Sequence, residues 1–345
     1  MDPRPAPSAA TVLVTGIGGF LGGHVAQQLL ASGYRVRGTV RNLDACDEIP
    51  KRLCATATAA KALSFTRADL CSDDGWDDAL EGCHYVIHTA SPFPAGLPDN
   101  ADNLIRTARD GALRVLRAAH KAGVSRVVLT SSIAATNHGS GRPPYTENDW
   151  TDPASARATP YYKSKTLAEQ AAWSFARCHG LDLCVINPAM IFGPLLGPQY
   201  GTSVGLIQQM MSGKLKRVPR FGFAIVDVRD VADAHIRAMT CPDAAGQRFI
   251  VGGGFFRLRD LAAVLATSFP DYAERLPRGD VPNWMVRALA PFSGRSRMIV
   301  HELDRDLSVS AAKAIRVLNW RPRPDEDCIR ASAQSLIDHR LIATP

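Results

Sequence analysis

A glycine-rich stretch that follows the first apolar run of this chain constrains its fold more than any other feature. Gly16, Gly19 and Gly22 are spaced three apart, between the apolar run Thr11 to Thr15 and the helical segment Gly23 to Ala31. Glycines there permit a tight turn, let an anion approach the bare backbone, and allow the helix to pack closely on the strand. Between the first strand and the first helix of a βαβ unit, this pattern predicts a loop that binds the pyrophosphate of a dinucleotide; the alternative is an ordinary tight turn.

From Thr11 onward, apolar runs alternate with helical segments, which is the pattern of βαβ units that form a parallel sheet. Asn103 to Ala122 has apolar residues at helical spacing, and Gly123 supplies a stop at its C-terminal end. We therefore expect an α/β fold, a doubly wound parallel sheet of the Rossmann type. The predicted strands are Thr11 to Thr15, Arg35 to Val40, Leu63 to Ala68, Tyr85 to Thr89, Arg126 to Thr130, Asp182 to Asn187 and Arg248 to Val251.

The alternation loosens after Pro188, and irregular segments are expected from Phe255 to Met298. A helix predicted over Asp227 to Met239 returns the chain to the first domain, so the division is discontinuous. Pro282 to Met298, which contains Trp284, predicts a pocket-lining helix of the second lobe, with a membrane-surface helix as the alternative. We expect a dinucleotide-binding domain of residues 11–190 and about 226–252, a smaller C-terminal substrate-binding lobe of about 191–225 and 253–341, and a flexible tail of residues 1–10.

The composition limits the classes of partner. The net charge is +7, and basic residues gather at Lys214 to Arg220 and Arg321 to Arg323, but no helix-turn-helix or aromatic-interleaved pattern accompanies them. A phosphate-bearing cofactor also favours a positive field, so we expect no nucleic acid as partner. No run of about 18 apolar residues is present, which argues against a membrane span. The eight cysteines are scattered without CxxC pairs, as expected for reduced thiols of a cytoplasmic protein without a metal site.

Residues at the ends of the second, third and fourth strands indicate the rest of a dinucleotide site. Arg41 stands where an NAD site usually carries an acidic residue, and its guanidinium can pair with a 2′-phosphate. NADP(H) is therefore the favoured cofactor, and the nearby Asp44 keeps NAD as the alternative. Asp69 can accept the adenine amino group, and the small-residue turn from His88 to Pro92 lets a nucleotide approach.

Tyr161 and Lys165 are four positions apart, so they share one face of a predicted helix. An ammonium beside a phenol favours the phenolate, so we expect a lowered tyrosine pKa and a residue that exchanges a proton near neutral pH. Tyr162 would need a lysine at position 166, where the chain has Thr166. Tyr161 is therefore the candidate acid.

The glycine loop, Thr130-Ser131-Ser132 and the Tyr161–Lys165 pair follow one another in the order found in a known family. The chain resembles the extended short-chain dehydrogenases/reductases, and within them the dihydroflavonol reductase and cinnamoyl-CoA reductase group, over residues 11–341. The residues that carry the resemblance are 36–41, 67–70, 147–152, 164–173, 187–188, 192–194, 227–232 and 319–322.

The resemblance implies roles for individual residues. Ser132 would hold the substrate carbonyl oxygen, Tyr161 would donate the proton, and Lys165 would bind the nicotinamide ribose. Two hydroxyl donors suit an oxygen that gains negative charge as hydride arrives, and strand alternation directs only one of Ser131 and Ser132 to the cleft. Asn137 matches an asparagine that contacts substrate in dihydroflavonol reductases, with a polar loop residue as the alternative. The implied cofactor contacts are Gly16, Gly19, Phe20, Leu21, Arg41, Asp69, Leu70, Ala90, Ser91, Lys165, Pro188, Met190, Ile191 and Ser203.

The function that this resemblance implies is an NADPH-dependent reductase of ketones or aldehydes, reversible as an alcohol dehydrogenase and assembled as a homodimer. Arg157 to Pro160 lacks the Trp- and Cys-containing stretch typical of cinnamoyl-CoA reductases. The alternatives are a nucleotide-sugar epimerase or dehydratase, a hydroxysteroid dehydrogenase, and a non-catalytic NADP-sensing protein. Ile133-Ala134 after Ser132 disfavours a dehydratase, which carries an Asp-Glu pair there.

Overall fold

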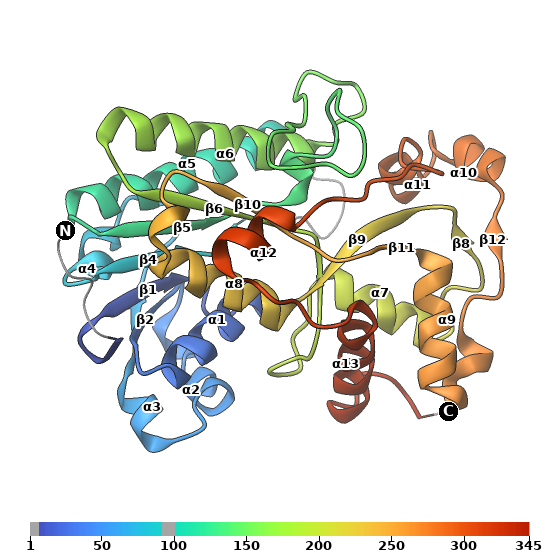
Figure 1. The fold of residues 1–345 in the computed structure, drawn as a ribbon. Helices are drawn as coiled ribbons and strands as arrows, with labels where there is room; N and C mark the ends of the chain where they lie inside the picture. Colours follow the sequence, from blue (N-terminus) through green and yellow to red (C-terminus); the bar gives the residue numbers. More distant parts are fainter. Residues whose placement is uncertain (1–6, 92–100, 345) are drawn as a thin grey trace.

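The central element of the protein is a parallel sheet whose strands follow the order β10-β6-β5-β4-β1-β2-β3 (Figure 1). The computed structural model describes residues 7–91 and 101–344. The chain order reverses beside β1, which pairs with both β2 and β4, and this confirms the predicted doubly wound α/β fold. The strands are β1 (Thr11–Thr15), β2 (Arg35–Val40), β3 (Leu63–Arg67), β4 (Tyr85–His88), β5 (Arg126–Thr130), β6 (Leu183–Pro188) and β10 (Arg248–Val251).

Helices cover both faces of this sheet, which is why β6 and β10 are buried along their whole length. One face packs on α1 (Phe20–Ala31) and α8 (Val228–Thr240), through residues such as Leu29 and Val231. The opposite face packs on α4 (Trp76–Leu80), α5 (Ala101–Lys121) and α6 (Pro160–His179), through residues such as Val115 and Ala172. Figure 1 shows α5 and α6 side by side along that face, in agreement with their packing. Two short helices, α2 (Glu48–Leu53) and α3 (Ala57–Lys61), lie between β2 and β3.

The second part of the molecule is more regular than the sequence suggests. Irregular structure is predicted for Phe255 to Met298, but the structure has two strands and three helices there. In α9, Leu258, Leu261, Ala262 and Leu265 are all buried and follow helical spacing, a signal that was present in the sequence. The elements of this part are β7 (Met190–Phe192), β8 (Val218–Pro219), β9 (Gly222–Asp227), β11 (Phe255–Arg257), β12 (Asp280–Val281), α7 (Thr202–Met211), α9 (Leu258–Ser268), α10 (Asn283–Leu289), α11 (Gly294–Ile299), α12 (Ala312–Leu318) and α13 (Asp325–Asp338).

A small sheet in the order β11-β9-β7 and the helices α7, α9 and α13 enclose a separate core. Phe192, Ile207, Leu261 and Leu336 are fully buried in it. This core supports the expected C-terminal lobe, whose boundaries stay a prediction. Of the predicted tail, residues 1–6 lie outside the described part of the chain, and Pro7–Ala9 form a short 3-10 helix.

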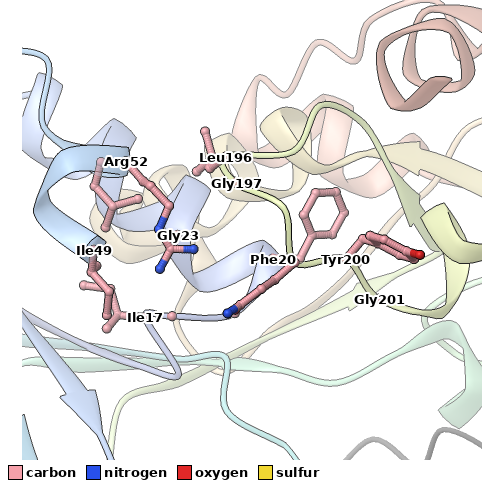
Figure 2. Close-up of a pocket in the computed structure, with 13 residues that line it drawn as sticks. Ile17, Phe20, Gly23, Ile49, Arg52, Leu196, Gly197, Tyr200 and Gly201 are labelled. Carbon is pink, nitrogen blue, oxygen red and sulfur yellow. The ribbon is translucent and has the colours of Figure 1, made fainter. Parts of the chain in front are cut away.

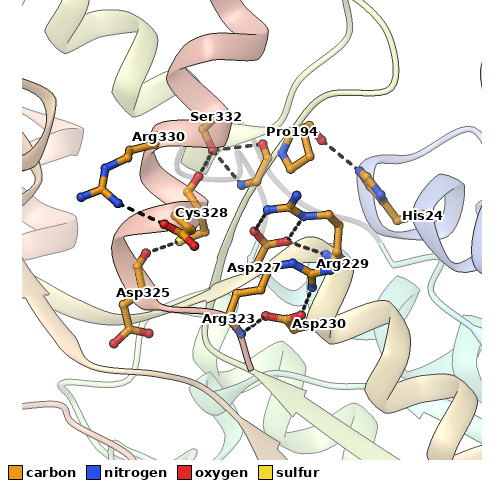
Figure 3. A network of polar contacts seen from close by, with 12 residues as sticks. His24, Pro194, Asp227, Arg229, Asp230, Arg323, Asp325, Cys328, Arg330 and Ser332 are labelled. Atoms are coloured by element: carbon orange, nitrogen blue, oxygen red, sulfur yellow. Dashed lines mark hydrogen bonds and ion pairs between the residues drawn. The ribbon is translucent and has the colours of Figure 1, made fainter. Parts of the chain in front are cut away.

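Charged side chains around the start of α8 connect the two parts (Figure 3). The Asp227 carboxylate caps α8 by accepting the backbone N–H of Arg229 at 2.8 Å, and it also pairs with the Arg229 guanidinium at 2.6 Å. Asp230, one turn further, pairs with Arg323, which precedes α13. Burial raises the pKa of Asp230, and the hydrogen bond from the Arg323 backbone N–H opposes that rise.

Two neutral contacts complete the connection. Ser332 of α13 accepts the backbone N–H of Gly193 at 2.7 Å, and a ring nitrogen of His24 in α1 lies 2.9 Å from the Pro194 carbonyl oxygen. The turn after β7 is therefore held between α1 and α13.

None of the helices formed by residues 7–91 and 101–344 is both long and apolar enough to cross a membrane. Within the same ranges, no three His, Cys, Asp or Glu side chains lie close enough together to hold a metal ion.

Candidate active site

The glycine loop lies at the carboxyl end of β1, and each of its three glycines meets a different steric demand. Gly16 has φ +68°, in the left-handed region that favours glycine. The N–H of Gly19 donates to the Gly16 carbonyl at 2.9 Å and closes the turn. A Cβ at Gly22 would lie 2.3 Å from the Gly16 oxygen, so only glycine lets α1 approach the strand this closely.

The residues of this loop fit the pyrophosphate of a dinucleotide. Gly19 is the N-cap of α1 and has no side chain to cap the helix, so the positive end of the helix is available to an anion. A Cβ at Gly16 would meet the backbone of Ala90 at 3.1 Å, which shows how closely the ends of β1 and β4 approach. The Ala90 N–H donates to the Thr15 hydroxyl at 3.0 Å and holds these two strand ends together.

A cavity of about 260 Å³ opens directly beside the loop (Figure 2). Its opposite wall is the segment Leu196 to Gly201 that follows β7. In Figure 2 the Arg52 guanidinium extends from α2 toward Gly23, at the start of α1. Arg52 is a basic residue near the phosphate loop that the sequence analysis missed. The sequence offered little indication of a role for Arg52, because a single arginine in a short helix has no distinctive spacing.

The residues predicted to hold the adenosine end lie at the ends of β2 and β3. Arg41 follows β2 and is exposed, as a guanidinium that pairs with a 2′-phosphate requires. Asp69 follows β3, and its Oδ1 accepts the backbone N–H of Cys71 at 2.9 Å. Leu70 packs against Gly111 of α5. Because β1, β2 and β3 are parallel neighbours, Arg41 and Asp69 lie along the same sheet edge as the glycine loop.

The start of α6 positions the candidate proton donor. Thr159 is the N-cap and accepts the Tyr162 N–H at 3.4 Å, and Pro160 occupies the first helical position, where its missing N–H costs nothing. The helix thus begins one residue before Tyr161, and Lys165 lies one turn further on the same face.

The hydroxyls of Tyr161 and Ser132 are hydrogen-bonded to each other. Lys165 is buried, and its Nζ donates to the Ser91 hydroxyl at 3.0 Å. The structure therefore brings the three candidate catalytic side chains, together with the end of β4, to one place. Ser131 points elsewhere, because its hydroxyl donates to the buried Glu169 at 2.6 Å. The predicted turn from His88 continues to Ser91, and Pro92 lies outside the described residues.

Burial dominates the electrostatics of this site. The four-residue spacing predicts a lowered phenol pKa, but the structure contradicts this: burial raises the pKa of Tyr161, and the hydrogen bond with Ser132 opposes the rise. Burial also lowers the pKa of Lys165 to about 8, against the attraction of Glu169. A desolvated ammonium that titrates near neutral pH is suited to proton exchange.

A buried polar network supports Ser132 from behind. The Asn187 amide donates to the Ser132 carbonyl at 3.1 Å and to Glu169 at 2.8 Å. Arg248 pairs with the same carboxylate at 2.8 Å and lies over the Trp150 ring. The sequence indicated no role for these supporting residues, because strands and a helix distant in the chain bring them together.

The remaining predicted residues lie around the start of the second part. Pro188 ends β6, and Met190 and Ile191 open β7. The Ser203 hydroxyl donates to the Ile191 carbonyl, which ties the first turn of α7 to β7. Asn137 is buried, and its Oδ1 lies 2.7 Å from Nδ1 of His138.

A Rossmann-type sheet with a glycine phosphate loop and a Ser-Tyr-Lys cluster defines the extended class of short-chain dehydrogenases/reductases. In agreement, the model of the NAD dependent epimerase/dehydratase family matches residues 12–252. The chain belongs to this family.

Individual relatives make the similarity more specific. Cinnamoyl-CoA reductase 1 of Petunia hybrida is 38% identical over 270 residues, which cover 77% of this chain and 79% of that protein. Dihydroflavonol 4-reductase of Zea mays is 34% identical over 77% of this chain and 76% of its own length. Among solved structures, Gre2 from Candida albicans in complex with NADPH has a TM-score of 0.79 at 28% identity, covering 96% of this chain and 99% of that one.

Proposed function

We propose that this NADPH-dependent reductase transfers hydride to the ketone or aldehyde carbonyl of a small molecule, with Tyr161 as the proton donor. The observation that carries the proposal is the hydrogen bond between Tyr161 and Ser132, one helical turn from the buried Lys165. Two hydroxyl donors that meet at one point can both bind a carbonyl oxygen as it gains negative charge.

When bound, NADPH supplies the hydride. Ser132 holds the carbonyl oxygen, and Tyr161 gives that oxygen its proton, so the carbonyl becomes an alcohol. A proton donor must start as the neutral phenol, and burial raises the pKa of Tyr161 and so favours that form. Lys165, with a pKa of about 8, binds the nicotinamide ribose and supplies a replacement proton near neutral pH. The same residues acting in reverse oxidise an alcohol.

The cofactor preference rests on charge. Arg41 at the end of β2 offers a cation where a 2′-phosphate would lie, and Arg52 adds a second cation beside the phosphate loop. Both features favour NADPH over NADH.

We place the substrate among dihydroflavonol-like and aryl carbonyl compounds rather than CoA thioesters. The dihydroflavonol and cinnamoyl-CoA reductases among the relatives support an aromatic substrate. The segment Arg157 to Pro160, which directly precedes Tyr161, departs from the stretch typical of the cinnamoyl-CoA enzymes and disfavours the thioester.

The test is to follow NADPH absorbance with purified protein against dihydroflavonols, cinnamoyl derivatives, aryl ketones, β-keto esters and aldehydes. Tyr161→Phe should lower kcat by about 100-fold or more, the usual contribution of a general acid. Tyr85→Phe is the matched control, because it removes a hydroxyl at the start of β4, at the opposite end of the sheet, and should leave kcat unchanged. Turnover by Tyr161→Phe at the wild-type rate would refute the proton-donor assignment.

A further inference from the structure

A buried pair of ionisable side chains joins the C-terminal part of the chain to the segment that follows Ser132. Nε2 of His138 lies 3.0 Å from Oε1 of Glu302, and the two side chains are 2% and 1% exposed. Glu302 follows α11, where its N–H donates to the Ile299 carbonyl at 2.9 Å. Burying such a pair is costly unless hydrogen bonds satisfy it, so its presence beside the active site calls for a role.

Both nitrogens of the His138 ring face oxygen atoms. Nδ1 lies 2.7 Å from Oδ1 of Asn137, and Nε2 faces the Glu302 carboxylate. An amide oxygen and a carboxylate only accept hydrogen bonds, so a ring with a proton on each nitrogen satisfies both contacts. The Asn137 carboxamide has two polar groups, Oδ1 and NH2. Oδ1 contacts His138, so NH2 is the group that can face the substrate.

The surroundings of the pair hold the His138 ring in place. The ring stacks on Tyr162, with ring centroids 3.9 Å apart and planes inclined by 30°. Tyr162 is the neighbour of Tyr161 at the start of α6. On the other side, Arg305 pairs with the second oxygen of Glu302 at 3.2 Å. The Glu302 carboxylate is thus shared between a cation and the ring that contacts Asn137.

We propose that Glu302, acting through His138, is a positioning residue that keeps Oδ1 of Asn137 engaged and turns its NH2 group toward the substrate. The proposal rests on the proposed function and on the substrate contact that the family resemblance predicts for Asn137. It gives the C-terminal part a way to set substrate recognition without contacting the substrate. Asn137 then offers a hydrogen-bond donor, and substrates that carry an acceptor near the reacting carbonyl are preferred.

The kinetic test is a double-mutant cycle of wild type, Glu302→Gln, Asn137→Ala and the double variant, with NADPH and an aryl ketone or β-keto ester reduced by the wild type. Glu302→Gln removes the carboxylate that faces Nε2 of His138, and it should raise KM for the carbonyl about fivefold, the worth of one neutral hydrogen bond. The expected kcat and the Kd for NADPH stay close to wild type. In the Asn137→Ala background, Glu302→Gln should have no further effect on KM.

An equal rise in KM with and without Asn137, or no rise at all, would overturn the proposal. If Glu302→Gln does not fold, His138→Phe replaces it in the cycle, because it keeps a ring to stack on Tyr162 and loses both hydrogen bonds. Asp182→Asn is the matched control: its carboxylate pairs with the buried Arg126 at 2.9 Å, beyond the amino end of β6, and its loss should lower stability without changing KM.

A measurement that needs no turnover separates this proposal from the proposed function. In protein with ¹⁵N-labelled histidine, the His138 ring, assigned by its loss in His138→Phe, should carry a proton on both nitrogens in the wild type and on one in Glu302→Gln. A wild-type ring protonated on one nitrogen overturns the positioning role. If the ring is doubly protonated but the protein reduces no carbonyl, the interaction of His138 with Glu302 is supported and only the proposed reductase function is refuted.

Discussion

Replacing Lys165 by methionine should make the protein more stable while it removes activity. The lysine is 8% exposed, and burial lowers its pKa from 10.5 to about 8. Each pKa unit corresponds to about 1.4 kcal/mol, so the folded state bears a cost of about 3 kcal/mol for holding the charged ammonium below pH 8. Methionine has a similar length and carries no charge. Loss of the hydrogen bond to Ser91 destabilises the variant by about 1 kcal/mol. The expected net gain in the free energy of unfolding is therefore about 2 kcal/mol.

The sign of the pH dependence follows from the two pKa values. The unfolded lysine keeps its proton up to about pH 10.5, whereas the folded one loses it near pH 8. Between these values the unfolded state binds more protons, so wild-type stability rises with pH. The advantage of Lys165→Met should therefore be full at pH 7 and nearly gone at pH 10.5.

Urea unfolding without NADPH, followed by tryptophan fluorescence at pH 7 and pH 10, measures this difference. Lys61→Met is the matched control, because Lys61 is exposed and the same substitution there should change stability by less than about 0.5 kcal/mol. A Lys165→Met protein that is no more stable than wild type at pH 7, or whose advantage is the same at pH 10, would refute the argument.

Three further predictions concern the glycine loop, the cofactor and the connection between the two parts. Gly22→Ala should weaken NADPH binding and cost about 1–3 kcal/mol of stability, because its Cβ would press on the Gly16 oxygen. Gly18→Ala should leave stability nearly unchanged when both variants are compared by thermal unfolding, because its Cβ would meet nothing nearer than 3.8 Å. Arg41→Ala should raise KM for NADPH about tenfold and leave KM for NADH unchanged; equal effects on both cofactors would argue against a 2′-phosphate contact. Arg323→Ala should lower the free energy of unfolding by about 1 kcal/mol in urea, because it removes the half-exposed guanidinium that pairs with Asp230 and leaves the backbone N–H bond in place.

Pattern alone was sufficient to predict the central sheet. Each strand of that sheet lies within one residue of its predicted position, as β6 does at Leu183–Pro188 against a prediction of Asp182 to Asn187. Strands buried on both faces appear as apolar runs, and the helices between them separate one run from the next. The small sheet was not predicted. Its central strand, Gly222–Asp227, is buried throughout, and a short apolar run of that length does not distinguish strand from helix.

The residues of the candidate site also fall into those that the sequence could predict and those that it could not. Gly16, Tyr161 and Lys165 were predictable because each belongs to a short local pattern whose spacing carries its chemistry. Glu302 was not predictable, because its partner His138 lies 164 positions away and no periodicity connects them. Spacing also could not predict the direction in which the pKa of Tyr161 shifts, because that shift depends on burial by residues distant in the chain.

The place of β10 at one edge of the main sheet has a consequence for synthesis of the chain. β6 ends at Pro188, and its partner β10 begins only at Arg248, after the small sheet has begun. A growing chain therefore presents β6 as an unpaired apolar edge while about 60 further residues are made. A pause in translation within this interval therefore prolongs the exposure of an edge that other chains can pair with.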